Sequence, residues 1–187
     1  MLKLYHCDIS KMSDEDFLNA YIKSDESRKA KADKLRKKPA KKLSIAAGEL
    51  VRNAVANEFN IEKDDIRFRV GKNGKPYIEG ISVHFSISHS KNIAVCAISD
   101  RPVGIDIEFI RDVNLNVAKR QFAPDELKYV FEKWDLSKKR FFEIWTRKEA
   151  YVKLLGKSIS YFPNFSVMGN NKIETHIRNR YIVSIAK

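Results

Sequence analysis

Two acidic side chains interrupt an apolar stretch near the middle of the chain. Residues 103–109 read V-G-I-D-I-E-F, so Asp106 and Glu108 alternate with apolar residues. In a β-strand, residues two apart point to the same face and lie about 6.6–6.8 Å apart. Asp106 and Glu108 would therefore share a face, with Gly104 beside them leaving room. Two carboxylates with limited access to water repel each other, and a divalent cation would relieve this repulsion.

Oxygen ligands alone favour magnesium, which binds to one or two carboxylates and completes its coordination with water and phosphate oxygens. An acid pair in a single strand is, however, more often the solvated face of an edge strand. The pair by itself therefore leaves both interpretations open.

A third acid falls on a predicted helix further along the chain. In a helical projection of residues 141–155, the large apolar side chains share one arc, and Glu149 lies at its edge, about 80° from Phe141. An ordinary surface residue is not expected there. Lys153 follows one turn later, where an i, i+4 ion pair is the simplest interpretation. Lys148 falls inside the arc, and its role is left open.

Together these segments resemble the signature pair of the phosphopantetheinyl transferase superfamily. Residues 104–108 (G-I-D-I-E) are similar to its G-[IV]-D-[IV]-E motif, and residues 145–153 (W-T-R-K-E-A-Y-V-K) to its W-x-x-K-E-[AS]-x-x-K motif. F-S-I-S-H-S at 85–90 and G-K-P at 74–76 are similar to two further motifs of the family. The order and spacing match the surfactin-synthetase-activating (Sfp) type, and the resemblance covers roughly residues 28–160.

The resemblance implies a Mg²⁺-dependent enzyme that transfers the 4'-phosphopantetheine arm of coenzyme A to a serine of an apo acyl or peptidyl carrier protein. Adenosine 3',5'-bisphosphate would be released. Asp106, Glu108 and Glu149 would hold Mg²⁺ against the pyrophosphate. Glu149 would also take the serine proton, and Lys153 would donate a proton to the leaving phosphate or stabilise its charge.

The same resemblance implies a set of residues that contact coenzyme A. They are Arg28, Lys31 and Lys75 at the nucleotide end, Ser88 and His89 at the phosphates, and Lys153. Two positions depart from the family pattern: Ser86 replaces an asparagine, and Leu43 stands where a basic residue commonly precedes a small hydroxyl, here Ser44. The contacts to the ribose phosphate are therefore left open.

The patterns around these residues predict helices and antiparallel strands in an α+β arrangement, because no regular βαβ spacing occurs. The predicted helices are Ser13–Ile22, Leu43–Val55, Pro124–Phe131 and Phe141–Leu155. The predicted strands are Ile66–Val70, Val83–Ser88, Ile93–Ile98, Val103–Phe109, Phe165–Met168 and Tyr181–Ile185, with turns at Gly71–Pro76 and Gly169–Asn171.

The turn at Ser99–Pro102 is the best candidate for a domain boundary. The resemblance implies two similar α/β lobes with antiparallel sheets, related by a pseudo-twofold axis, with the active site between them. Residues 1–101 would bind the nucleotide of coenzyme A, and residues 102–187 would carry the metal and catalytic residues. A monomer is expected on the same basis.

Composition limits the class of protein and the partners. The chain has 187 residues and a net charge of +12, and the segment 23–42 contributes a large share of that charge. Such a surface attracts polyanions, including nucleic acid, a nucleotide cofactor or an acidic protein. No apolar run approaches the roughly 18 residues of a membrane span, and the N-terminus does not resemble a secretory signal. Cys7 and Cys96 lack metal-ligand spacing. These features predict a cytoplasmic, non-membrane protein without a disulfide.

Two alternatives were weighed against the transferase. A basic RNA- or DNA-binding module would explain the charge but leaves Asp106, Glu108 and Glu149 without a role. A Mg²⁺-dependent nuclease would use the acids, but many nuclease sites place a lysine two residues after the strand glutamate, where this chain has Ile110. We therefore expect no nucleic-acid partner. The carrier protein and its pathway are not predicted.

Overall fold

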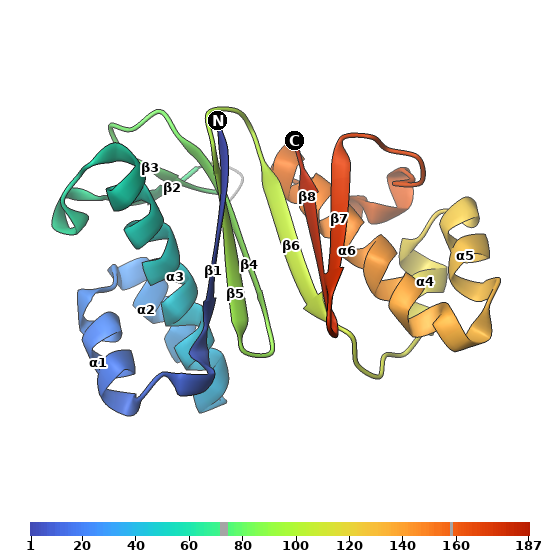
Figure 1. Cartoon of the computed structure of the whole chain (residues 1–187), viewed down its shortest axis with the longest axis horizontal. Helices are drawn as coiled ribbons and strands as arrows, with labels where there is room; N and C mark the ends of the chain where they lie inside the picture. Colours follow the sequence, from blue (N-terminus) through green and yellow to red (C-terminus); the bar gives the residue numbers. More distant parts are fainter. Residues whose placement is uncertain (72–74, 158) are drawn as a thin grey trace. The chain divides into compact units, whose positions relative to one another are not determined.

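The structure, a computed structural model, describes residues 1–71, 75–157 and 159–187. The chain divides into two compact units, Met1–Arg101 and Pro102–Lys187. Each unit combines helices with a three-stranded antiparallel sheet (Figure 1). The predicted α+β class is confirmed.

The sheet of the N-terminal unit has the strand order β1-β5-β4. Its strands are β1 (Leu2–Asp8), β4 (His84–Ser90) and β5 (Ile93–Ser99). The central strand β5 is the most apolar of the three, since both of its edges are paired and it is buried along nearly its whole length. A separate two-stranded hairpin consists of β2 (Phe68–Val70) and β3 (Pro76–Ile78).

Three helices accompany this sheet: the longest packs against its strands, and the two shorter ones pack against the longest. They are α1 (Asp14–Lys23), α2 (Glu26–Asp33) and α3 (Lys38–Phe59), with short 3-10 turns η1 (Ile9–Lys11) and η2 (Lys63–Asp65). α1 begins at the predicted cap, where the Ser13 hydroxyl accepts a hydrogen bond from the Asp16 N–H at 3.0 Å. The apolar stripe of α3, including Val51 and Val55, packs against Phe85 and other sheet residues.

The C-terminal unit is built around one long helix on a second sheet. The sheet consists of β6 (Gly104–Phe109), β7 (Ile173–Arg178) and β8 (Tyr181–Ala186) in the order β6-β8-β7. The helices are α4 (Asn116–Gln121), α5 (Pro124–Phe131) and α6 (Ser137–Leu155), with 3-10 turns η3 (Trp134–Leu136) and η4 (Ile159–Asn164). α6 contacts all three strands (Figure 1).

Gly104 allows α6 to lie very close to β6. An ideal Cβ at Gly104 would lie 1.9 Å from the Ala150 carbonyl oxygen and 2.6 Å from the Leu154 nitrogen. The expectation that Gly104 leaves room beside the acids is wrong, because the α6 backbone fills this space. Because alternate strand residues share a face, Asp106 and Glu108 lie on the α6 side of β6 together with Gly104.

The predicted strand Phe165–Met168 is wrong. This segment has no strand structure, because buried side chains rather than a neighbouring strand bond its backbone. Lys148 donates to the Phe165 carbonyl, and the Val167 N–H donates to Glu126. The strand lies later, at β7, where the alternation I-E-T-H-I-R was overlooked.

Other elements were absent from the prediction or lie partly outside the structure. The strand β1 and the short helices α2 and α4 were not predicted, and α6 begins at Ser137 rather than Phe141. Residues 72–74 of the predicted turn, including Gly74 of the G-K-P triplet, lie outside the described residues. Cys7 and Cys96 are both free thiols. Over the described ranges, none of the helices has the length and apolar composition that crossing a membrane requires.

The close approach at Gly104 predicts a large effect of one methyl group. Gly104→Ala should lower the free energy of unfolding by about 1–3 kcal/mol or more, since the obstructing atoms belong to helix backbone and cannot rotate away. Urea unfolding followed by circular dichroism measures this. Gly71→Ala is the matched control, because a Cβ there meets a single atom at 3.3 Å. Equal stability of the two variants would contradict the packing described above.

Candidate functional site

α6 brings Glu149 and Lys153 to the acid pair of β6. The Lys153 ammonium donates hydrogen bonds to Asp106 Oδ1 at 2.7 Å and to the Ile105 carbonyl at 3.1 Å. Glu149, one helical turn earlier, is close enough to Asp106 and Glu108 for their charges to affect its ionisation. Four residues that the sequence placed in two distant motifs thus gather within the C-terminal unit.

Burial and neighbouring charges both affect the ionisation of Glu149. Burial raises the pKa of Glu149 to about 6, and the charges of Asp106 and Glu108 act in the same direction while Lys153 opposes them. Asp106 is only 5% exposed. A carboxyl group with such a pKa binds and releases a proton near neutral pH, which an exposed glutamate does not.

The strand acids are paired with cations of the protein itself. Besides the Lys153–Asp106 pair, Arg111 donates to Glu108 Oε2 at 2.7 Å. Across the described part of the chain, no three His, Cys, Asp or Glu side chains form a ready-made metal-ligand set.

The donor set nevertheless fits a hard dication such as Mg²⁺ in its chemistry. All three acids offer oxygen ligands, and burial, together with the negative charges of Asp106 and Glu108, raises the pKa of Glu149. Lys153 and Arg111 retain 28% and 53% side-chain exposure, so both can withdraw into solvent. A dication would therefore replace these cations at the strand acids.

Three hydroxyl groups fix the position of α6 on the sheet beside Asp106. Ser184 is the register partner of Asp106 on β8. Its hydroxyl lies 2.8 Å from Thr146 Oγ1 of α6 and 3.0 Å from Thr175 Oγ1 of β7. These bonds help to determine which turn of α6 faces β6. The sequence analysis overlooked them, although one serine in the apolar strand Y-I-V-S-I-A was a signal.

Lys148 forms a buried ion pair with Glu126, which could not be predicted from the position of Lys148 on the helix. Its ammonium is fully buried and lies 3.0 Å from Glu126 Oε2, which is equally buried. It also donates to the carbonyls of Phe162 at 2.8 Å and Phe165 at 2.5 Å. Glu126 in turn accepts the Val167 N–H. The pair ties α5, α6 and residues 162–167 together.

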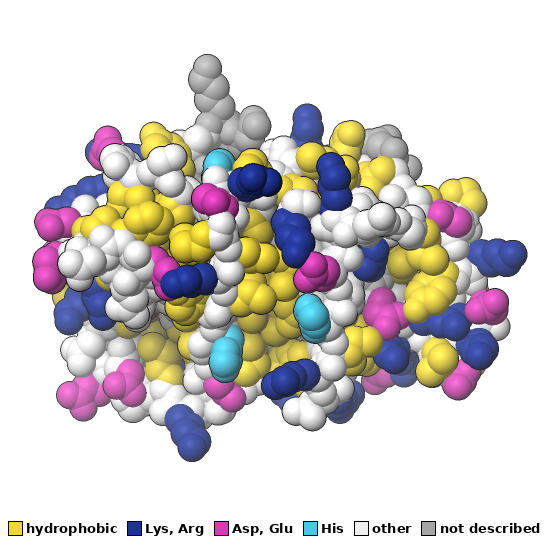
Figure 2. Space-filling model, turned by 45° about the horizontal axis from the view of Figure 1, so that its top comes forward, with side chains coloured by type: hydrophobic (Ala, Val, Ile, Leu, Met, Phe, Trp, Pro, Cys, Tyr) yellow, Lys and Arg dark blue, Asp and Glu magenta, His cyan; other side chains and the backbone are white. Residues whose placement is uncertain are grey.

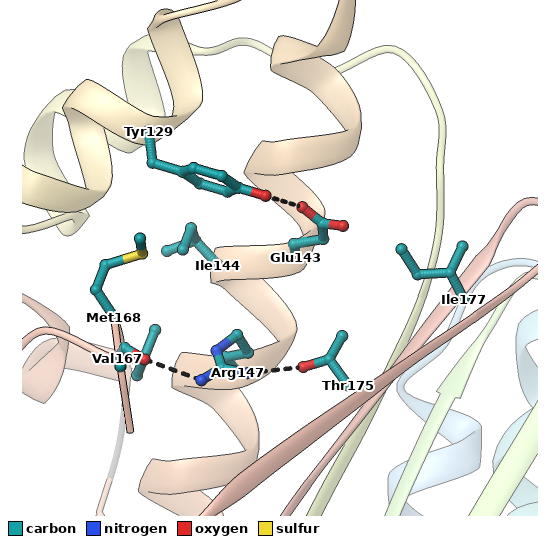
Figure 3. A pocket seen from close by; sticks show the side chains of 9 residues that line it. Tyr129, Glu143, Ile144, Arg147, Val167, Met168, Thr175 and Ile177 are labelled. Carbon is teal, nitrogen blue, oxygen red and sulfur yellow. Dashed lines mark hydrogen bonds between the residues drawn. The ribbon is translucent and has the colours of Figure 1, made fainter. Parts of the chain in front are cut away.

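A pocket of about 330 Å³ lies beside α6 and is lined by Tyr129, Glu143, Arg147 and other residues, but not by the acids of the candidate site. Figure 3 shows Tyr129 of α5 directed at Glu143, and Arg147 directed at the loop and β7. Arg147 bonds Thr175 Oγ1 at 3.1 Å and the Val167 carbonyl at 3.0 Å. The arginine of the second motif therefore anchors the loop before β7 and points away from the acids.

Apart from Lys153 on α6, the residues expected to contact coenzyme A lie in the N-terminal unit. Arg28 and Lys31 are on α2, where Arg28 is partly buried and Lys31 is exposed. Lys75 immediately precedes β3, and burial lowers its pKa. Ser88 and His89 are neighbours on β4, so their side chains point to opposite faces of the sheet. The two side chains could contact the same phosphate only if that phosphate lay beyond the end of β4, where both faces of the sheet can be reached.

The basic segment 23–42 covers the end of α1, all of α2 and the start of α3. Part of its charge is balanced locally, since Lys38 and Lys42 lie 2.6 and 2.9 Å from the two carboxylate oxygens of Asp14. Lysine and arginine side chains are also spread over the face drawn in Figure 2, with acidic side chains between them. The excess charge is thus distributed rather than gathered into one uninterrupted patch on that face.

Comparison with known proteins agrees with the motifs. A family model described as 4'-phosphopantetheinyl transferase, N-terminal, matches residues 11–101, and one described as 4'-phosphopantetheinyl transferase superfamily matches residues 102–185. The chain therefore belongs to the 4'-phosphopantetheinyl transferase superfamily.

Individual relatives support the Sfp type within that superfamily. The 4'-phosphopantetheinyl transferase gsp of Aneurinibacillus migulanus is 38% identical over 136 residues, which are 72% of this chain and 56% of gsp. Sfp of Bacillus subtilis (strain 168) is 37% identical over 121 residues, 63% of this chain and 54% of Sfp. Psf-1 of Bacillus pumilus is 35% identical over 136 residues, 72% of this chain and 58% of psf-1. The chain spans about half the length of the curated relatives it matches.

The raised pKa of Glu149 predicts a pH-dependent stability of the metal-free protein. Because the pKa in the folded state, about 6, exceeds the ordinary value of 4.5, ionisation of Glu149 destabilises the fold as the pH rises through this range. Glu149→Gln should therefore match the wild type near pH 4.5 and exceed its free energy of unfolding by about 1–2 kcal/mol at pH 8. Urea titrations in EDTA at both pH values test this. A variant less stable than wild type at pH 8 would contradict it.

The buried pair predicts a second stability effect. Lys148→Ala should lower the free energy of unfolding by about 3–5 kcal/mol, because Glu126 is left buried without its cation. Lys139→Ala, at an exposed position of the same helix, is the control and should change it by less than about 0.5 kcal/mol. The double change Glu126→Gln and Lys148→Met should recover part of the loss, since it buries no unpaired charge. If Lys148→Ala and Lys139→Ala had similar free energies of unfolding, the Lys148–Glu126 pair would be dispensable for stability.

Proposed function

We propose that the protein transfers the 4'-phosphopantetheine arm of coenzyme A to a serine hydroxyl of an apo acyl or peptidyl carrier protein and releases adenosine 3',5'-bisphosphate. One observation carries the proposal: Asp106 and Glu108 on β6 meet Glu149 and Lys153 on α6, in a chain of this superfamily. The relatives gsp, psf-1 and Sfp are named 4'-phosphopantetheinyl transferases, which supports the same activity here.

The protein side chains have chemistry suited to each proton and charge in this reaction. The serine oxygen attacks the phosphorus that bears the pantetheine arm, and the bond from that phosphorus to the bridging oxygen breaks. Glu149, with a pKa of about 6, is mostly ionised at pH 7–8 and is suited to take the serine proton, directly or through water. The Lys153 ammonium would stabilise charge on the leaving phosphate or protonate it.

Asp106, Glu108 and Glu149 would hold Mg²⁺, which would neutralise charge on the pyrophosphate of coenzyme A. Lys153 bonds Asp106 Oδ1 in the structure, and a dication held by this carboxylate would compete with that bond. A Lys153 ammonium released in this way would be available to a phosphate. The proposed metal site and the proposed role of Lys153 therefore depend on the same exchange.

Several finer expectations belong to this proposal and remain predictions. The N-terminal unit would bind the nucleotide of coenzyme A, with the active site between two lobes related by a pseudo-twofold axis. The protein would be a cytoplasmic monomer without a nucleic-acid partner. The residues assigned to coenzyme A are Arg28, Lys31, Lys75, Ser88, His89 and Lys153. A crystal structure with bound coenzyme A and Mg²⁺ would test the assigned contacts. Light scattering would test whether the protein is a monomer in solution.

The transferase proposal predicts a loss of activity without a loss of fold. Purified protein with coenzyme A and Mg²⁺ should add the arm to at least one apo carrier protein from fatty-acid, polyketide or nonribosomal-peptide synthesis, as seen by intact-protein mass spectrometry. Asp106→Ala and Glu149→Ala should each lower the rate by at least about 10³-fold, because each removes a ligand or base at the reacting phosphate.

Asp112→Asn is the matched control for the loss of an acid, because Asp112 is 94% exposed and pairs only with Lys138 among the contacts described. It should transfer at the wild-type rate. EDTA should stop the wild-type reaction, and added Mg²⁺ should restore it. Activity retained by both alanine variants would refute the assigned metal site. A wild-type protein inactive on every carrier class would refute the transferase function.

A further inference from the structure

Gly48 lies in the interior of α3, where glycine is less favourable than alanine. Its backbone conformation does not require glycine, since its φ is not in the left-handed region. The reason lies in its surroundings. An ideal Cβ at Gly48 would lie 2.9 Å from Arg28 Nε, 3.3 Å from Cδ and 3.4 Å from Cγ. The side chain of Arg28, from α2, therefore lies directly across the bare backbone of Gly48.

Two acids act on Arg28 in this position. Burial lowers the pKa of its guanidinium, and the negative charges of Asp25 and Glu49 counteract this. Asp25 is the N-cap of α2 and accepts the Arg28 backbone N–H at 2.9 Å. Glu49 is the neighbour of Gly48 on α3. Both acids favour the charged guanidinium, and the Arg28 side chain lies partly buried against Gly48 of α3.

An arginine held in this way is well suited to bind a phosphate. Its planar group offers two parallel N–H donors to phosphate oxygens. A side chain that already lies against a helix loses less conformational entropy on binding than one that moves freely in solvent. Arg28 is also one of the three residues assigned to the nucleotide end of coenzyme A, together with Lys31 and Lys75.

We propose that Gly48 is a positioning residue for coenzyme A: its missing side chain forms the seat on which Arg28 lies, so that the guanidinium is directed to the ribose phosphate of the cofactor. This inference rests on the proposed function. It differs from a purely structural account, in which Gly48 merely lets α2 pack on α3. Under that account a methyl group at Gly48 would change stability and leave the affinity for coenzyme A unchanged.

The test is a double-mutant cycle with Gly48→Ala, Arg28→Ala and the double variant. Calorimetry measures binding of coenzyme A and of dephospho-coenzyme A, which lacks the ribose phosphate, and thermal unfolding measures stability. Arg28→Ala should weaken coenzyme A binding by roughly tenfold or more, as expected for a lost charge-assisted hydrogen bond.

Gly48→Ala should produce much of the same loss while the unfolding midpoint stays equal or rises. In the Arg28→Ala background, Gly48→Ala should have no further effect. Binding of dephospho-coenzyme A should be nearly the same in all four proteins.

Asn57→Ala is the matched control for helix propensity, because Asn57 is an exposed residue of α3 well away from Gly48. It should raise the unfolding midpoint without changing coenzyme A binding. In the transfer assay, Gly48→Ala should raise KM for coenzyme A and leave kcat nearly unchanged.

Several results would overturn the inference. These are wild-type affinity in Gly48→Ala, wild-type affinity in Arg28→Ala, and an equal loss from Gly48→Ala with and without Arg28. Failure of Gly48→Ala to fold would do so as well, because the obstructing atoms belong to a movable side chain. All of these leave the transferase function standing if the wild type transfers the arm. A wild type that neither binds coenzyme A nor transfers the arm would instead refute the function.

Discussion

The candidate site depends on the contact between the backbone of α6 and the backbone of β6 at Gly104. The Ala150 carbonyl occupies the place where a Cβ would stand, so the helix axis lies closer to the strand than any other residue type would allow. Asp106 follows Gly104 on the same face, and Glu149 and Lys153 flank Ala150 and Leu154 on the helix. The glycine thus acts on the acids by bringing the helix toward them.

This approach has an electrostatic consequence. An acid on a helix-covered face loses water, and a second acid brought near it cannot ionise freely. The structure resolves the conflict in part with Lys153 and Arg111, and the remainder appears in the raised pKa of Glu149. The proposed metal site and the proposed role of Glu149 as a proton acceptor would both draw on these features, namely acids that are close together and have lost water. Binding of a dication and binding of a proton would then have a common physical origin.

The sequence predicted local elements well where one physical pattern dominated. The capping residues at Ser13 and the apolar stripe of α3 each specify a helix without reference to the rest of the chain. Phe165–Met168 was misread because its backbone partners are the side chains of Lys148 and Glu126, which no local pattern reveals. β1 was overlooked because an edge strand with exposed residues on both faces has no clear alternation.

The candidate site could also be predicted where local patterns determine it, and not where it depends on contacts between distant segments. The motifs indicated which acids belong together, because a strand acid pair and a helix acid on an apolar arc are each unusual. They did not indicate that α6 fills the space at Gly104, since this depends on backbone approach between segments far apart in sequence. Nor could they reveal the role of Lys148, because its partner Glu126 lies on another helix that the fold brings to it.

The comparison of these two lysines shows how burial decides what an ion pair can do. Lys148 and Glu126 are both 0% exposed, so neither can leave the other without an unpaired charge remaining in the interior. That pair can therefore only have a structural role. Lys153 retains 28% exposure beside Asp106, so water can solvate its ammonium once it leaves the carboxylate. Two pairs with the same chemistry on one helix therefore differ in what they permit: the buried pair holds α6, α5 and residues 162–167 together, whereas the part-exposed pair can open to solvent, as the proposed metal site would require.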